Sequence, residues 1–177
     1  RADYVLLLNN DTIVTNHLLE EMTAEGNAAD RIGIVGGKIY YADRSSVLWA
    51  HGGMFNVNTG HARHGRTEKL LTGNAVKGEY LYVPGCLMLI ARACIADIGL
   101  LSERFFHLGE DVEYCLRAQK RGWRLAFASG AVIYHKVSSS MQSLSPLYNY
   151  YEQRNRLMIV REYHQNRNPV RMVFDRM

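Results

Sequence analysis

The stretch SERFFHLGEDVEYCLRAQKRGW, residues 102–123, decides the fold because it joins a pair of acids to a well-marked helix. The helix is predicted by side chains that recur at spacings of three and four and form one mainly apolar face: Val112, Cys115, Leu116 and Gln119. Gly122 is a typical helix stop. Glu110 and Asp111 therefore stand in the first turn, where backbone N–H groups and the helix dipole favour negative charge.

Two interpretations of this acid pair are open on the stretch alone. A carboxylate held at the start of a helix can accept a proton from a substrate hydroxyl, and Phe105 and Phe106 would wall such a site. Alternatively, Glu110 and Asp111 only stabilise the helix start, as acids commonly do there. The rest of the chain has to decide between them.

The composition is that of a globular chain with one domain. Its 177 residues, 47% hydrophobic and 21% charged, are enough to bury a core. The three cysteines form no CxxC pair, which favours buried free thiols in a reducing compartment over a disulfide framework: Cys86, Cys94 and Cys115. The longest apolar run, residues 87–91, is too short to span a bilayer. The net charge is only +4 and basic and aromatic residues are not interleaved, so we expect no nucleic-acid partner.

A second group of polar residues follows the first predicted strand. Residues 4–8, YVLLL, form a continuous apolar run that predicts a strand buried on both faces. Asn9 and Asp11 come directly after it, at the kind of strand end where open α/β sheets bind ligands. Asp11 could bind a divalent cation and Asn9 a nucleotide or its ribose. A plain turn explains the same residues equally well.

The remaining periodic segments alternate between strand and helix patterns. Helices are predicted at 16–29, with Leu18, Leu19 and Met22 on one face, at 92–98 and at 146–164. Strands are predicted at 33–41, with a bulge or turn at a Gly-Gly pair, and at 79–83, 86–91, 124–128 and 131–134. This alternation predicts an α/β fold.

Residues 45–78 are the least regular third of the chain. Short strands are predicted at 47–50 and 54–57. His51, His61 and His64 do not form a zinc site on their spacing, and a loop or hairpin explains them more simply. Four glycines suggest a mobile excursion that closes over a substrate: Gly60, Gly65, Gly73 and Gly78.

Three polar sites thus stand at the ends of apolar segments, and we expect them to converge on one cleft. They are Asn9–Asp11, Glu110–Asp111 and His135. Chemistry that fits this set needs a cation to neutralise a leaving phosphate group and a base to activate a hydroxyl. Asp11 and His135 can meet the first need, and Asp111 the second.

Four blocks of the sequence, in this order and spacing, resemble a family 2 glycosyltransferase, close to the rhamnosyltransferase-like members. They are YVLLLNNDTIV, VPGCLMLIAR, IGLLSERFFHLGEDVEYCLRAQKRGWRLAFASGAVIYHK and YYEQRNRL, and together they cover about residues 3–163. The resemblance implies a partial GT-A fold, a mixed sheet flanked by helices, for a donor that is a nucleoside-diphosphate sugar.

The resemblance also implies roles for single residues on the donor side. The family's Asp-x-Asp motif falls on Asn9, Asn10 and Asp11, where Asn9 departs from the pattern because it brings no charge. Asp11 would carry the divalent cation, Mn²⁺ or Mg²⁺. Gly85 and Cys86 match a segment beside the donor sugar.

Other roles concern the chemical step and the acceptor. The family's Glu-Asp motif falls on Glu110 and Asp111, where Asp111 would be the general base. His135 matches a histidine that contacts the metal or the diphosphate in similar enzymes. The acceptor side is assigned to Arg154 and Asn155, together with Trp123.

The function that the resemblance implies is inverting, metal-dependent transfer of a sugar to a glycan or polyprenyl-linked acceptor, in cell-surface polysaccharide synthesis. The enzyme would be cytoplasmic. The segment LMIVREY either lies against anionic lipid at the inner face of the membrane or simply packs on the domain, as a helix ordinarily does. Two alternatives stay open: a non-catalytic fragment that binds a glycan or lipid carrier, and a metal-dependent nucleotidyltransferase, which would release pyrophosphate.

The resemblance further predicts which part of a domain the chain represents. Residues 1–164 would be the C-terminal part of a GT-A domain, with the metal, base and acceptor elements, and residues 165–177 a weakly ordered tail. The β-α-β unit that grips base and ribose in such enzymes would lie before Arg1. We therefore expect this chain alone to bind a donor weakly and to turn over slowly.

Overall fold

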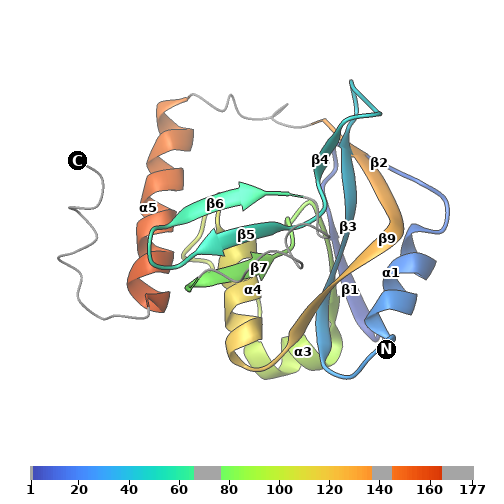
Figure 1. The fold of residues 1–177 in the computed structure, drawn as a ribbon, viewed down its shortest axis with the longest axis horizontal. Coiled ribbons are helices and arrows are strands. Elements are labelled where there is room, and N and C mark those ends of the chain that lie inside the picture. Colours follow the sequence, from blue (N-terminus) through green and yellow to red (C-terminus); the bar gives the residue numbers. More distant parts are fainter. Residues whose placement is uncertain (1, 66–76, 137–144, 165–177) are drawn as a thin grey trace.

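The computed structural model describes residues 2–65, 77–136 and 145–164, and shows one mixed sheet flanked by helices together with a second, smaller sheet (Figure 1). The main sheet has the strand order β1-β8-β3-β9-β2, and β4 also pairs with β3. Its strands are β1 (Tyr4–Leu8), β2 (Thr12–Val14), β3 (Ile32–Tyr41), β4 (Leu48–Ala50), β8 (Leu87–Ala91) and β9 (Arg124–His135). Only β3 and β9 pair in parallel among these, so the predicted mixed α/β sheet is confirmed.

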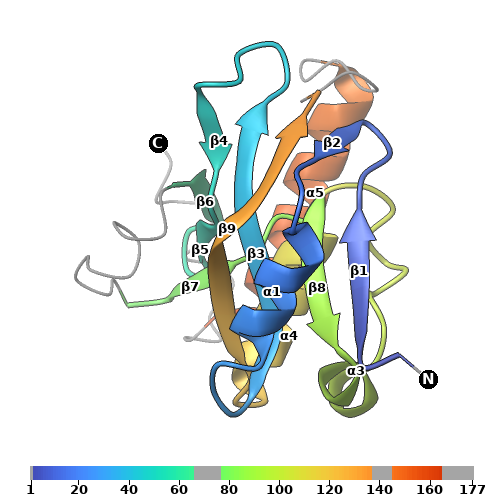
Figure 2. The same cartoon turned by 90° about the vertical axis from the view of Figure 1, so that its right-hand side faces the viewer.

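Helices cover both faces of the main sheet. Helix α1 (Leu18–Gly26) lies on one face, and α3 (Arg92–Ile98) and α4 (Glu110–Lys120) lie on the other (Figure 2). The smaller antiparallel sheet has the order β6-β5-β7, with β5 (Gly53–Asn56), β6 (His61–His64) and β7 (Glu79–Tyr82). Helix α5 (Pro146–Tyr163) lies on the far side of this sheet from β3 (Figure 1).

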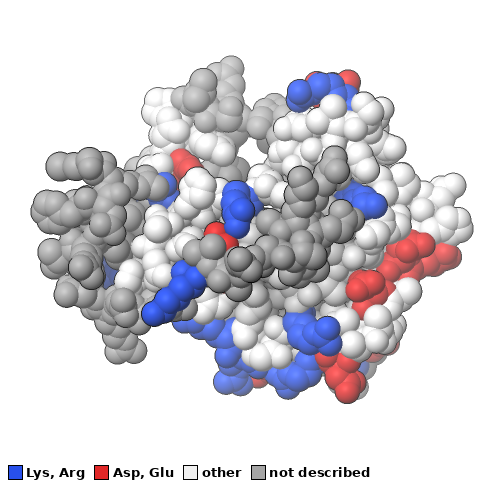
Figure 3. Space-filling model, in the orientation of Figure 1, with Lys and Arg blue, Asp and Glu red and all other residues white. Residues whose placement is uncertain are grey.

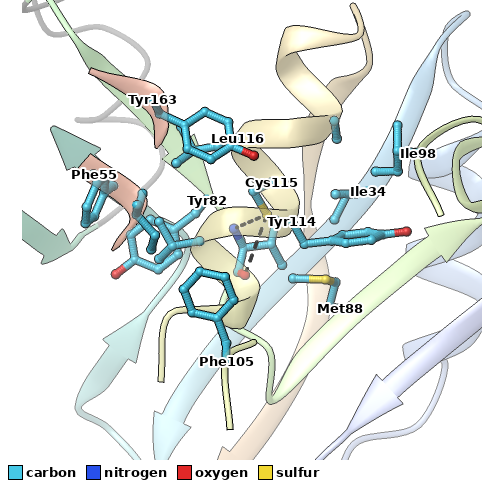
Figure 4. Close-up of a cluster of buried hydrophobic side chains, with 14 of the residues drawn as sticks. Ile34, Phe55, Tyr82, Met88, Ile98, Phe105, Tyr114, Cys115, Leu116 and Tyr163 are labelled. Carbon is cyan, nitrogen blue, oxygen red and sulfur yellow. Dashed lines mark hydrogen bonds between the residues drawn. The ribbon is translucent and has the colours of Figure 1, made fainter. Parts of the chain in front are cut away.

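The core has two layers because strand side chains alternate between the faces of the sheet. In β8, Leu87 and Leu89 pack on the side of α1, whereas Met88 and Ile90 pack on the side of α4. Helix α4 lies between the two sheets in the second layer, with Phe55 and Tyr82 on one side and Ile34, Ile98 and Met88 on the other (Figure 4). The larger layer therefore joins α4 to both sheets.

Strand β1 departs from its predicted environment. It lies at the edge of the described sheet, pairs with β8 in the antiparallel direction, and leaves Val5 and Leu8 about two-fifths exposed. The prediction that it is buried on both faces is therefore wrong. The prediction that Leu19 shares a face with Leu18 and Met22 is also wrong, because Leu19 points to solvent while the other two face the sheet.

Other differences concern element limits. The expected pair of strands at 124–128 and 131–134 is one strand, β9, with Ser129 and Gly130 inside it. The predicted Gly-Gly bulge occurs as a register shift between Gly37 and Lys38, opposite that interruption. Helix α1 begins at Leu18, with His17 rather than Thr15 or Asn16 before it.

Surface features agree with a domain of mixed charge. Acidic side chains gather over α1 and basic ones are spread along the lower edge of the face in Figure 3, so the described residues of this face form no large patch of one sign. The three cysteines are free and buried, as predicted.

No described helix combines the length and apolar content needed to cross a bilayer. The predicted tail at 165–177 and most of the predicted excursion around Gly73 lie outside the described residues.

Candidate active site

One cavity of about 650 Å³ lies where the main sheet, the smaller sheet, the start of α4 and one side of α5 meet. Seven of the residues predicted for the site line it: Asn9, Gly85, Cys86, Glu110, Asp111, His135 and Asn155. Asp11 does not line the cavity itself but touches His135, which does. The structure thus brings the three predicted polar sites to one opening.

The backbone around Asp111 holds its carboxylate in place. Gly109 precedes α4 in a left-handed conformation, with φ of 85°, which turns the chain so that the first residues of α4 face the cavity. The Gly85 N–H donates to Asp111 Oδ2 over 2.9 Å, and the Val112 N–H lies 2.7 Å from Asp111 Oδ1. Burial raises the pKa of Asp111, although these two amides oppose the shift.

Glu110 shares the cavity but is held differently. Its Oε2 atom is buried and has no hydrogen-bond partner among the described residues. Burial, and then the charge of Asp111, raises the pKa of Glu110 to about 7. Two carboxyl groups so close cannot both ionise easily, which is a common property of sites that move protons.

Asp11 and His135 meet because β2 pairs with the end of β9. Thr12 lies opposite His135 in that ladder, and the Lys136 N–H donates to the Asp11 carbonyl. His135 Nε2 lies 3.1 Å from Asp11 Oδ1 and 3.4 Å from Asn9 Nδ2. Asn9 is held in turn by its N–H, which donates to the Cys86 carbonyl.

Cys86 lies between the two acid sites. Burial raises the pKa of its thiol to about 12, and the charges of Asp111 and Asp11 both add to this shift. The fields of both carboxylates therefore reach the same sulfur atom. Asp111 lines the cavity itself, whereas Asp11 is connected to it only through His135.

The donor set at Asp11 and His135 fits a divalent cation that takes its other ligands from substrate. No group of three or more His, Cys, Asp or Glu side chains that could hold a metal occurs within the described ranges. His135 Nδ1 is buried without a hydrogen-bond partner there. A carboxylate and an imidazole supply two ligands, and cations bound with phosphates commonly use only one or two protein ligands. The imidazole favours Mn²⁺ over Mg²⁺, which prefers oxygen.

Some predicted site residues lie beside the cavity rather than in it. Asn10 is exposed in the turn after β1, where the Thr12 hydroxyl donates to the Asn9 carbonyl. The turn that these residues favour is therefore present, and Asn9 also lines the cavity. Neither Phe105 nor Phe106 lines the cavity, because Phe105 is packed in the core and Phe106 is 78% exposed.

The residues predicted for the acceptor side have different positions. Asn155 lines the cavity, is buried, and donates from Nδ2 to the carbonyls of His107 and Leu108. Arg154 donates to the Arg104 carbonyl and does not line the cavity. Trp123 lies beyond the opposite end of α4, where its indole N–H donates to Asp97. The structure therefore separates Trp123 from the other predicted residues.

Sequence reasoning missed several residues that line the cavity. Trp49 and His64 come from the irregular third of the chain, Tyr82 ends β7, and Tyr148, Glu152 and Arg156 come from α5. The α5 residues share a face at spacings of four, which is a signal in the sequence. Trp49 and His64 carry no such pattern, because their positions depend on how β4 pairs with β3 and how β6 pairs with β5.

Comparison with known proteins identifies a family for almost the whole chain. The sequence model of a family described as Glycosyl transferase family group 2 matches residues 4–176. No curated protein matches this sequence.

Proposed function

The chain belongs to glycosyl transferase family group 2, and we propose that it transfers a sugar from a nucleoside-diphosphate donor to an acceptor hydroxyl with inversion, using Asp111 as general base. The observation that carries this proposal is that Asp111 and the Asp11–His135 pair serve a single cavity. Transfer between a diphosphate leaving group and a hydroxyl needs a base and a counter-charge on opposite sides of one sugar.

The chemical role of each group follows from its surroundings. Asp111 is held by the Gly85 and Val112 amides, so its carboxylate can take the proton of the attacking hydroxyl without moving. Its raised pKa makes it a stronger base than an ordinary aspartate. In an inverting step the hydroxyl oxygen bonds to the anomeric carbon as the bond to the diphosphate oxygen breaks, so no sugar–enzyme bond forms.

Asp11 and His135 would hold a divalent cation, which supplies charge stabilisation to the departing diphosphate when bound. Asn9 lies against His135 and can donate to a phosphate or ribose oxygen. Gly85 and Cys86 join the two acid sites along the wall of the cavity. We place the sugar of the donor against this wall, between Asp11 and Asp111.

The finer assignment follows the four blocks of sequence. They resemble rhamnosyltransferase-like enzymes, so we propose a hexose or deoxyhexose donor and a glycan or polyprenyl-linked acceptor, in cell-surface polysaccharide synthesis on the cytoplasmic side of the membrane. A GT-A arrangement of donor and acceptor is part of the same proposal. It is supported by the mixed sheet and by acids at the ends of β1 and at the start of α4.

The test is a product assay with matched variants. The chain is incubated with Mn²⁺ and UDP-glucose, GDP-mannose or dTDP-rhamnose, and both nucleoside diphosphate and pyrophosphate are measured. We expect nucleoside diphosphate, its release slowed at least ~100-fold by Asp111→Asn, in line with the loss of a general base. Asp43→Asn, an exposed aspartate paired with Arg44, is the control.

Binding separates the two acid sites. Calorimetry with UDP, GDP or dTDP and Mn²⁺ should show weaker binding in Asp11→Asn and nearly unchanged binding in Asp111→Asn. Pyrophosphate as product would favour a nucleotidyltransferase. Sugar transfer by Asp111→Asn at the rate of the parent would show that Asp111 is not the general base.

A further inference from the structure

The smaller sheet presents a pair of hydrogen-bonded side chains to the cavity that the transfer chemistry above does not use. His64 ends β6 and Tyr82 ends β7, and both line the cavity together with Trp49 of β4. The His64 ring centroid lies 4.5 Å from that of Trp49 and 5.8 Å from that of Tyr82. His64 thus contacts two aromatic rings while it stays exposed at the rim of the cavity, next to the wall that carries the acids.

A glycine lets this pair form. In the smaller sheet, Gly53 lies directly opposite His64 on one side and opposite Tyr82 on the other. Strands two apart are separated by about 9–10 Å, so the two side chains meet only by crossing the strand between them. A Cβ atom on Gly53 would lie 2.3 Å from the Tyr82 ring. The missing side chain therefore opens the path along which Tyr82 reaches His64.

Burial decides which side chain donates the hydrogen bond between Tyr82 and His64. Tyr82 Oη lies 3.1 Å from His64 Nδ1, and the hydroxyl points away from α4 (Figure 4). Tyr82 is buried, and among the described residues His64 is the partner of its hydroxyl, so the O–H must donate to Nδ1 or stay unsatisfied. Burial raises the pKa of Tyr82 well above its usual range, which keeps this proton in place.

The consequence is a fixed tautomer of His64. The ordinary pKa of histidine already lies below 7, and partial desolvation lowers the pKa of the exposed His64 further despite the opposing charge of Asp111, so the ring is neutral above pH 7. With Nδ1 accepting from Tyr82, the ring proton lies on Nε2. Nε2–H is then a neutral donor on a ring that borders the cavity and is close enough to Asp111 to feel its charge.

We propose that His64, held by Tyr82 across Gly53, is a substrate-positioning residue that donates from Nε2 to a hydroxyl of a sugar ring bound at Asp111. The inference rests on the proposed function, because it places a sugar in this cavity. A neutral donor suits a hydroxyl, and a site built to bond a hydroxyl discriminates against a sugar that lacks it. The sugar belongs either to the donor or to the acceptor.

The tautomer is tested first, without any ligand. In ¹⁵N NMR spectra at pH 7.5, His64 should show a neutral ring with the proton on Nε2, and Tyr82→Phe should mix the two tautomers. Gly53→Ala should have the same effect, because its methyl group displaces the Tyr82 ring. A parent ring with its proton on Nδ1 would overturn the proposal.

Binding is tested through tryptophan fluorescence, since the chain has two tryptophans and only Trp49 lines the cavity. In a Trp123→Phe background, UDP, UDP-glucose, GDP-mannose and dTDP-rhamnose are titrated with Mn²⁺ present. We expect His64→Ala to weaken binding of the sugar nucleotide about 3- to 10-fold, as for one lost hydrogen bond, and to leave UDP unchanged. His64→Gln, which keeps an N–H donor, should restore part of the loss.

The remaining outcomes distinguish a donor sugar from an acceptor sugar, and the role of His64 from the proposed glycosyl transfer. If donor binding is unchanged but the KM for the acceptor rises with kcat nearly constant, His64 positions the acceptor sugar. If neither changes while UDP still binds, the role of His64 is overturned and the proposed function stands. If the parent binds none of the nucleotides, both fall.

Discussion

At the scale of single residues, the chemistry depends on two neighbouring carboxyl groups with different surroundings. Asp111 accepts from two backbone N–H groups, whereas Glu110 has a buried oxygen without a partner in the described chain. Both have a raised pKa because burial disfavours their charge. The charge of Asp111 adds to the raised pKa of Glu110, so Asp111 loses its proton first.

The first prediction concerns the pH dependence of transfer. A base acts in its deprotonated form, so kcat/KM should fall as pH drops through the raised pKa of Asp111, above the ordinary aspartate value of about 4. Glu110 keeps its proton while Asp111 titrates, because burial and the charge of Asp111 raise the Glu110 pKa to about 7, so Glu110→Gln should leave this acid limb in place. The measurement is nucleoside diphosphate release between pH 4 and 9. An acid limb that moves to lower pH in Glu110→Gln would mean that Glu110 is already charged when Asp111 titrates, against this order.

The second prediction concerns stability and the same pair. The pKa of Glu110 is raised to about 7 in the folded state, so folded Glu110 keeps its proton to higher pH than unfolded Glu110 does. The free energy of unfolding should therefore fall as pH rises from about 4 to 7. Glu110→Gln removes this loss and should be more stable than the parent by on the order of 1–2 kcal/mol at pH 8.

Urea unfolding at pH 8 and pH 4 measures this difference. Glu103→Gln, an exposed glutamate that precedes the same helix, is the control and should change nothing at either pH. A gain in Glu110→Gln that is equal at both pH values would show that charge is not its cause.

At the scale of elements, α5 holds the loop that leads into the acid pair. Asn155 donates to the carbonyls of His107 and Leu108, and these residues directly precede Gly109. Tyr163 also donates to Glu113 of α4, which Arg117 pairs with as well. Helix α5 thus fixes α4 from outside, both before its first residue and within its first turn.

The third prediction tests this support. Asn155→Ala leaves two carbonyls without their donor, so the free energy of unfolding should fall by about 2 kcal/mol. The loop that orients Asp111 loosens, and kcat should fall more than the affinity for nucleoside diphosphate. Asn149→Ala, an exposed asparagine on the same helix, is the matched control. Normal kcat in a destabilised Asn155→Ala would limit Asn155 to a structural role.

The same scale shows what sequence could and could not predict. Strand ends and helix starts are local patterns, so the sequence could place Asn9, Asp11, Glu110 and His135 at the ends of apolar segments, and the family resemblance supplied their proposed roles. Trp123, which was assigned to the acceptor side, has no such pattern around it and does not lie near Asp111. An 11-residue helix about 16 Å long lies between the two, and it separates them.

The residues that were missed depend on pairing between strands. The position of His64 follows from the register of β6 against β5, and its contact with Tyr82 requires a glycine opposite both. Neither fact is encoded within a few residues of His64. The half-exposed β1 is a similar case, because an apolar run does not show how many neighbours a strand has.

At the scale of the whole molecule, the proposed cation site joins distant parts of the chain. Asp11 and His135 are 124 residues apart and meet only when β2 pairs with β9. The unfolded chain cannot hold both groups together, so a cation that bridges them binds the folded state preferentially. Once the cation concentration exceeds the dissociation constant, the free energy of unfolding rises with the logarithm of that concentration.

The last prediction follows from that linkage. Mn²⁺ alone should raise the Tm of the parent, and UDP, GDP or dTDP added with Mn²⁺ should raise it further because the diphosphate supplies the remaining ligands. At 100 times the dissociation constant the gain is about 2.7 kcal/mol. Asp11→Asn should remove the response to Mn²⁺, whereas Asp43→Asn should keep it. A response of equal size in Asp11→Asn would mean that the cation binds elsewhere, and the counter-charge for the leaving diphosphate would then have to come from another part of the cavity.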